Sequence, residues 1–149
     1  MKRLSSAEAL LEMQQLQVCG GTGCHSSESE EVMAVLRQAL QDIGRNDVEV
    51  KQVGCFGFCA QGPIVRVMPD DTFYVQVKPG DAPSIVQEHI AERRFIDRLL
   101  YTDPADAQVH RRQDEMPFYK KQVRLALRHC GAIDPESLED YLAVEGYEG

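Results

Sequence analysis

The fold follows from one stretch of the sequence, Gln15-Leu16-Gln17-Val18-Cys19-Gly20-Gly21-Thr22-Gly23-Cys24. Its first four residues alternate polar and apolar side chains, which is typical of a half-buried β-strand. The strand leads directly into a loop bounded by two cysteines, and the glycines of that loop let the backbone follow a close path. We therefore predict a strand whose carboxyl end delivers Cys19 and Cys24 to a single loop.

A helix is predicted directly after this loop. Ser27 and Glu30 have the spacing of a capping box, which indicates its start, and Gly44 stands where a C-terminal cap belongs. Between them one apolar stripe recurs at helical spacing: Val32, Val35, Leu36, Ala39, Leu40 and Ile43. A shorter helix is predicted near the N-terminus, where Ser5 and Glu8 form another capping box.

The remaining elements complete a small sheet. Residues 48–53 form a β-rich run, and 64–68 and 73–77 are two strands joined by turn residues, which predicts an antiparallel hairpin. Asp81 and Pro83 predict the start of a last helix. Because the first two strands flank a helix, they should pair in parallel. The predicted fold is α/β: a thioredoxin-like small mixed sheet with flanking helices, followed by a short helical extension.

Composition and charge narrow the function classes. The apolar fraction of 43% and the charged fraction of 27% are typical of a globular protein. A net charge of −8 argues against nucleic acid as the main partner, since phosphate binding needs a basic face. No apolar run approaches the roughly 20 residues that span a bilayer, which predicts no membrane insertion. The segment after the charged N-terminus is amphipathic, unlike a signal peptide, and we expect a cytoplasmic protein.

The candidate site consists of four cysteines in two pairs. Cys19 and Cys24 form a C-x4-C motif, and after 30 residues Cys55 and Cys59 form a C-x3-C motif. An iron–sulfur cluster needs four converging thiolates and backbone amides that are free to bond the sulfurs, and both glycine-rich loops supply these. Phe56 and Phe58 would shield one side. The sequence thus favours a cluster with Cys19, Cys24, Cys55 and Cys59 as ligands and no residue as acid, base or nucleophile.

Three alternatives use the same cysteines differently. A structural zinc site also takes four cysteines, usually in tight knuckles. A dithiol oxidoreductase would need a C-x-x-C pair, which is absent. Four merely buried cysteines would not be expected in two glycine-rich pairs. Outside this group, Cys130 is expected to be a packed core residue on the apolar stripe of a helix from Pro117 to Gly131, and His25 an exposed loop residue.

Two sequence segments resemble known proteins. The cysteine loops, including Gly54-Cys55-Phe56-Gly57-Phe58-Cys59 and then Gly62-Pro63, resemble the thioredoxin-like [2Fe–2S] ferredoxin domains of complex I-like NADH dehydrogenases and NAD(P)-linked hydrogenases. The stretches 118–122, 127–131 and 133–136 are similar to the opening of the flavin-binding subunit in those complexes. Their order resembles the NADH-oxidising (51 kDa-type) flavin subunit of electron-bifurcating or NAD(P)-linked hydrogenases.

The resemblance implies a division of the chain and a role. Residues 1–92 are expected to form the [2Fe–2S] ferredoxin domain, 93–116 a linker, and 117–149 the helical start of a flavin/NADH-binding domain. The charge changes from −6 over 1–92 to +4 over 93–128, which agrees with a boundary there. Helices are expected from Pro117 and from Asp134.

The expected role is single-electron relay to or from a flavin/NAD(P)H-binding subunit or domain, beside other iron–sulfur subunits of a multisubunit redox complex. FMN, NAD(P) and further clusters are expected only in a continuation or a partner subunit, because no nicotinamide or flavin site is visible in these residues. The alternative function is a zinc-stabilised interaction module of such a complex without a redox role.

Overall fold

The computed structural model describes residues 14–147, so the helix predicted around Ser5 and Glu8 lies outside the described residues. Its centre is a four-stranded mixed sheet in the order β2-β1-β3-β4. The strands are β1 (Gln15–Cys19), β2 (Glu49–Val53), β3 (Val65–Met68) and β4 (Thr72–Tyr74). β1 pairs in parallel with β2 and antiparallel with β3, and β3 and β4 form the expected hairpin. This confirms the predicted α/β, thioredoxin-like arrangement.

Helix α3 (Ser29–Asp42) buries Val32, Leu36 and Leu40 of the predicted stripe, and Val35 and Ala39 pack against the same core, but Ile43 lies beyond the helix and is exposed. Its end is as expected: Gly44 is left-handed at φ 69°, Gly44 N–H donates to Gln41, and Arg45 N–H donates to Leu40. The predicted capping box at its start is wrong. In the turns that follow the short helix α2 (Thr22–His25), the Ser27 N–H donates to the Cys24 carbonyl. Glu28, with a left-handed φ of 72°, then precedes α3, and no side chain caps the start of that helix.

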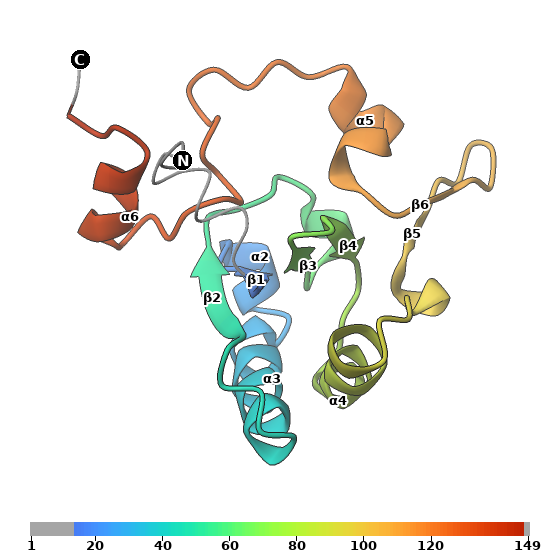
Figure 1. The fold of residues 1–149 in the computed structure, drawn as a ribbon. Helices are drawn as coiled ribbons and strands as arrows, with labels where there is room; N and C mark the ends of the chain where they lie inside the picture. Colours follow the sequence, from blue (N-terminus) through green and yellow to red (C-terminus); the bar gives the residue numbers. More distant parts are fainter. Residues whose placement is uncertain (1–13, 148–149) are drawn as a thin grey trace, which may run out of the picture.

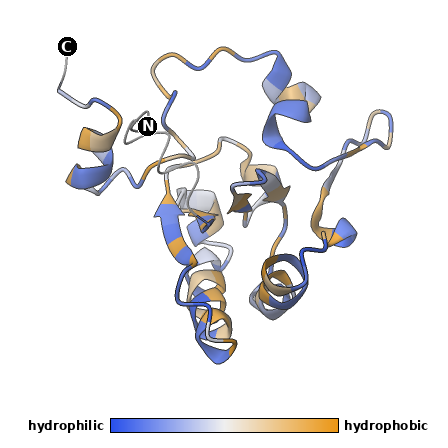
Figure 2. Cartoon of the chain, in the orientation of Figure 1, coloured by the Kyte–Doolittle hydropathy of each residue, from blue (hydrophilic) through white to orange (hydrophobic). Residues whose placement is uncertain are grey.

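The helix that follows the four-stranded sheet combines α4 (Ala82–Ser84) with a π-helical continuation, Ile85–Ala91. Pro83 lies in its first turn as predicted, but Asp81 does not cap it, because the Asp81 carboxylate accepts the Lys78 N–H instead. Figure 1 shows α3 and α4 on one side of the sheet. Hydrophobic residues alternate with hydrophilic ones along both helices (Figure 2), as expected for elements with one buried face. No helix in the described part of the chain could cross a bilayer.

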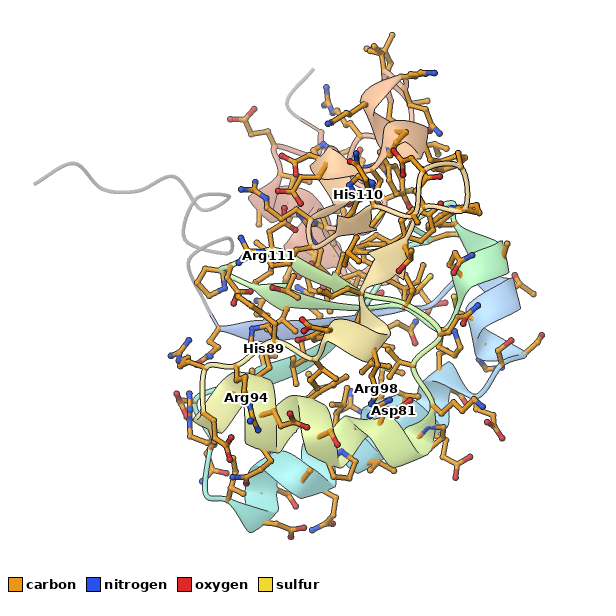
Figure 3. The ribbon with its side chains drawn as sticks, turned by 90° about the vertical axis from the view of Figure 1, so that its right-hand side faces the viewer. Asp81, His89, Arg94, Arg98, His110 and Arg111 are labelled. Atoms are coloured by element: carbon orange, nitrogen blue, oxygen red, sulfur yellow. The ribbon has the colours of Figure 1, made fainter. Side chains whose placement is uncertain are left out.

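The segment after residue 92 continues along the β4 edge of the sheet. Val75 N–H donates to Leu99 O at 2.8 Å, and Phe73 N–H donates to Arg111 O at 2.8 Å. Between these anchors, β5 (Tyr101–Thr102) and β6 (Val109–His110) form a two-stranded sheet. An ion pair between Arg98 and Asp81, at 2.5 Å, joins the segment to the start of α4 (Figure 3). The domain boundaries predicted from sequence remain predictions.

A buried polar network holds the same segment to the helix. The Tyr74 hydroxyl and His89 Nδ1 are 2.8 Å apart, and His89 Nε2 lies 2.7 Å from a carboxylate oxygen of Asp70. Ile96 N–H donates to the Tyr74 hydroxyl at 3.2 Å. Burial acts to raise the pKa of Asp70, but the hydrogen bonds from His89 and Thr72 outweigh it and lower that pKa. His89, labelled in Figure 3, is therefore a structural residue.

The C-terminal part is less helical than predicted. α5 (Pro117–Lys120) begins at Pro117 but ends after four residues, so the helix expected to reach Gly131 is wrong beyond Lys120. In the part of the chain that the structure describes, Val123 and Leu127 of its apolar stripe are exposed, so they gain no burial that would stabilise a longer helix. The helix expected at Asp134 is α6 (Leu138–Ala143), which begins four residues later, where the Ser137 side chain accepts the Asp140 N–H.

Candidate metal centre

Parallel pairing of β1 and β2 brings the two cysteine loops together. Cys19, the last residue of β1, lies in register with Val53, the last residue of β2. Immediately beyond, Gly20 N–H donates to Val53 O at 2.8 Å, so the two loops leave the sheet side by side. Cys55 follows β2 after a single residue, Gly54. One strand end thus positions one cysteine of each pair.

The other two cysteines lie on short helical turns. Cys24 lies within α2, and Cys59 begins the 3-10 helix Cys59–Gln61. Two glycines mark how closely the loops approach: a Cβ on Gly21 would lie 2.9 Å from Cys55 Sγ, and one on Gly62 would lie 2.6 Å from Cys24 Sγ. The backbone of each cysteine loop therefore packs against a cysteine of the other loop. The structure brings all four predicted site residues together.

The four thiols form a chain of contacts. The Cys19 side chain interacts with those of Cys24 and Cys55, and Cys55 interacts with Cys59. The interaction with Cys24 lowers the pKa of Cys19 to about 6, although burial opposes this. The same interaction and burial raise the pKa of Cys24, and burial raises that of Cys55. A stabilised thiolate at Cys19 is suited to bind iron, because the thiolate is the metal-binding form.

Backbone amides also point at the sulfurs. Gly57 N–H donates to Cys55 Sγ at 3.2 Å, which is possible because Gly57 takes the left-handed φ of 79°. The backbones of Phe56 and Gly21 act on Cys19 in the same sense and help to lower its pKa. Amide bonds to sulfur are one of the main ways in which a protein tunes an iron–sulfur site. Backbone amides that are free to bond the sulfurs were predicted from the two glycine-rich loops.

The group is buried on one side only. Cys19 and Cys24 are each 1% exposed, Cys55 is half-buried, and Cys59 lies at the surface. The site is therefore shielded at its inner end and reaches solvent at its outer end. Solvent exposure is one of the properties through which a protein sets the reduction potential of an iron–sulfur cluster.

The aromatic shield is larger than predicted. Phe56 is buried and packs edge-on to Phe73, as a shielding residue should. Phe58 is half-buried and contacts three aromatic rings beyond those predicted for the site: Tyr101, Phe118 and Tyr119. These three residues lie far along the chain, and no sequence signal links them to the cysteines.

The remaining candidates have different outcomes. His25 is exposed, as expected, and lies 3.4 Å from the Glu30 carboxylate. Cys130 was expected to be a core residue on a helix, but it lies outside α5 and is only half-buried. Its backbone packs on Gly54, where an added Cβ would lie 3.5 Å from Cys130 Cα. The prediction failed because the helix that was to bury Cys130 does not form.

A family model described as thioredoxin-like [2Fe-2S] ferredoxin matches residues 11–89, just over half of the chain. The chain belongs to this ferredoxin family. Membership implies a [2Fe–2S] cluster, and the cysteines that such a cluster requires are present. The matched range contains both cysteine loops and the whole four-stranded sheet.

Individual comparisons agree with the ferredoxin family. A 2Fe-2S ferredoxin from Clostridium pasteurianum is 37% identical over 78 residues, which are 51% of this chain and 76% of that protein. A thioredoxin-like [2Fe-2S] ferredoxin from Aquifex aeolicus superposes with a TM-score of 0.55 at 28% identity, covering 62% of this chain and 99% of that one. A third similarity is short. Over 30 residues the chain is 67% identical to the NADP-reducing hydrogenase subunit HndC of Solidesulfovibrio fructosivorans, and this match covers 20% of this chain and 6% of that protein.

The donor geometry of this ferredoxin fits a binuclear cluster better than one zinc ion. Within residues 14–147, the only three donor side chains whose ligand atoms all lie within 4.8 Å of one another are Asp103, Asp106 and His110. The cysteine sulfurs are therefore more widely spread. Zinc with Zn–S bonds of about 2.3 Å would need tetrahedral sulfurs about 3.8 Å apart. Two irons, each holding two thiolates, suit the wider arrangement.

The close approach at Gly21 gives a testable consequence for the ferredoxin site. A Gly21→Ala substitution would place a methyl group 2.9 Å from Cys55 Sγ, so one of the two cysteine loops must move. We expect lower cluster occupancy after anaerobic reconstitution, measured as iron and acid-labile sulfide per chain. Gly80→Ala is the matched control, because nothing lies within 4 Å of that position. Equal occupancy in both variants would contradict the packing argument.

Proposed function

We propose that Cys19, Cys24, Cys55 and Cys59 ligate the [2Fe–2S] cluster, and that the chain relays single electrons to or from an NAD(P)H-oxidising flavin unit of a multisubunit complex. The observation that carries the first part is the contact chain of thiols formed by the two interleaved loops. Its interacting pairs suggest the assignment: Cys19 and Cys24 on one iron, and Cys55 and Cys59 on the other.

The residues of this chain would hold the cluster and shield it from solvent. When bound, the cluster would accept and release one electron at a time. Cys19 and Cys24 form the buried end of the site, and the Gly57 N–H donates a hydrogen bond to Cys55 Sγ. Cys59 is exposed, so this edge is the proposed point at which electrons enter or leave. No side chain in this scheme moves a proton or attacks a substrate.

Two observations support a flavin-linked partner. The first is the short, strong similarity to the NADP-reducing hydrogenase subunit HndC. The second is the set of exposed apolar side chains on α6, where Leu138 and Leu142 are 57% and 52% exposed. Apolar side chains gathered on one helix are typical of a contact surface. We propose that the flavin unit covers α6, and that this complex works in the cytoplasm.

The cluster is tested on anaerobically purified protein. We expect a coloured sample with about two irons and two sulfides per chain, which gains a spin-half EPR signal on reduction with dithionite. The alternative, a zinc-stabilised interaction module, predicts a colourless sample that contains zinc and gives no EPR signal. That result would contradict the electron-transfer proposal.

The partner is tested on tagged protein purified anaerobically from its native host. We expect FMN and an NAD(P)H-reducible EPR signal to co-purify with the wild-type protein. A Leu138→Asp, Leu142→Asp variant should keep its own cluster but lose the co-purifying FMN. The matched control is Val109→Asp, which adds a charge at a site that is 57% exposed on β6. Retention of FMN by the α6 variant would rule out α6 as the contact surface.

A further inference from the structure

One peptide unit beside Cys55 is hydrogen-bonded at both ends. Its N–H, from Gly57, donates to Cys55 Sγ at 3.2 Å, and its carbonyl, from Phe56, accepts the Tyr119 hydroxyl at 3.0 Å. The two bonds share the amide plane between Phe56 and Gly57. A carbonyl that accepts a hydrogen bond makes the N–H of the same amide a stronger donor, because the bonds polarise one another. The hydroxyl is thus coupled to a cysteine sulfur through a single peptide.

Tyr119 is held firmly in this position. It is only 8% exposed, and its ring packs edge-on to Phe58 and Phe73 at centroid distances of 5.7 and 6.2 Å. Arg124 lies over the ring, 5.8 Å from its centre. Burial raises the pKa of Tyr119 to about 12, so the hydroxyl keeps its proton and remains a donor at neutral pH.

The tyrosine comes from outside the ferredoxin region. Tyr119 lies on α5, 30 residues beyond the end of the matched range 11–89. The same C-terminal segment holds the loop at a second point, where Gly54 N–H donates to Ile133 O at 2.9 Å. Figure 1 shows the orange segment passing over the end of the sheet from which the β2–β3 connection leaves. The segment therefore belongs to the wall of the cysteine site.

We propose that Tyr119 is a positioning residue that strengthens the Gly57 N–H···Sγ bond to Cys55 and thereby raises the reduction potential of the cluster. The proposal rests on the ligand assignment given above. Reduction adds negative charge, part of which lies on the cysteine sulfurs. A donor at the sulfur stabilises the reduced form more than the oxidised form, so a stronger donor shifts the potential upward. Loss of the tyrosine hydroxyl should shift it downward.

The test is a Tyr119→Phe variant of the full chain with its cluster loaded. This change removes one oxygen atom and keeps the ring that packs on Phe58. We expect a midpoint potential more negative than that of the wild type in an EPR-monitored redox titration. We also expect a smaller D2O-induced shift of the Fe–S stretching bands in resonance Raman spectra, because the amide proton at Cys55 is less tightly held.

Tyr101→Phe is the matched control. Tyr101 also packs edge-on to Phe58, at 5.1 Å, and is 7% exposed, but it comes from β5 and does not bond to the Phe56 carbonyl. Its potential should equal that of the wild type. A Tyr119→Phe potential that is unchanged or more positive, with a normal cluster signal, would overturn the role of Tyr119 alone. A wild-type chain that binds no cluster would instead overturn the ligand assignment.

Discussion

Replacement of Cys19 by alanine is expected to remove the [2Fe–2S] cluster almost completely. Cys19 is 1% exposed and interacts with both Cys24 and Cys55, so its loss leaves three sulfurs and a gap at the centre of the contact chain. Alanine offers no atom that could replace the thiolate. We expect visible absorption and iron content of about a tenth of the wild-type values or less after anaerobic reconstitution, since a site that lacks one ligand binds metal far more weakly.

The matched control is Cys130→Ala, which removes the fifth cysteine. Cys130 is half-buried and its backbone packs on Gly54, close to the second cysteine loop. We expect this variant to keep the cluster absorption and the EPR signal of the wild type. A fully loaded Cys19→Ala protein would refute the ligand assignment, and so would a Cys130→Ala protein that has lost its cluster.

His89→Ala is expected to cause the largest loss of stability among single polar substitutions in the four-stranded sheet and the helices that pack on it. His89 is 2% exposed and joins the Tyr74 hydroxyl to the Asp70 carboxylate. Its removal leaves both groups with one partner fewer and opens a cavity under the segment that carries Ile96. We expect the free energy of unfolding to fall by about 2–4 kcal/mol. Urea denaturation of the loaded protein, followed by circular dichroism, measures this change.

His129→Ala is the control for this experiment. His129 lies in the segment after α5, outside the four-stranded sheet, and its imidazole accepts a hydrogen bond from the neighbouring Arg128. Its loss should change the free energy of unfolding by less than about 0.5 kcal/mol, because His129 is only half-buried and outside the core. If the two histidine variants were equally stable, the network of Tyr74, His89 and Asp70 would contribute nothing to the fold.

The elements with strong local signals could be predicted from the sequence. The stripe from Val32 to Leu40 identifies α3 because burial of one helix face has the period of the helix itself. The alternation before Cys19 and the turn at Asp70 and Asp71 are local strand and turn signals, although both faces of β1 are in fact buried. Sequence patterns failed where the outcome depended on distant partners. Among the described residues the helix expected after Lys120 does not form, and Val123 and Leu127, which would have been on its buried face, are exposed.

The cysteine site could be predicted only in part. The two spaced pairs and their glycines predict four thiols near one another, and the structure brings the thiols together. Their order of contact, with Cys19 between Cys24 and Cys55, follows from the register of β1 on β2 and is not visible in the spacing. Tyr119 could not have been found at all. It reaches Phe56 across 63 residues of sequence, and such long-range contacts leave no local pattern.

The sequence alone was therefore sufficient to predict the α/β fold class and to identify the four cysteines of the site, because periodicity, turn chemistry and ligand spacing are local properties of the chain. Tertiary structure decided which cysteines are buried, which amides face the sulfurs, and how the segment after residue 92 joins the site. Those features depend on strand register and on packing between residues far apart in sequence. The hydroxyl of Tyr119 against the Phe56 carbonyl is the clearest case, since only the folded chain brings these two groups to 3.0 Å.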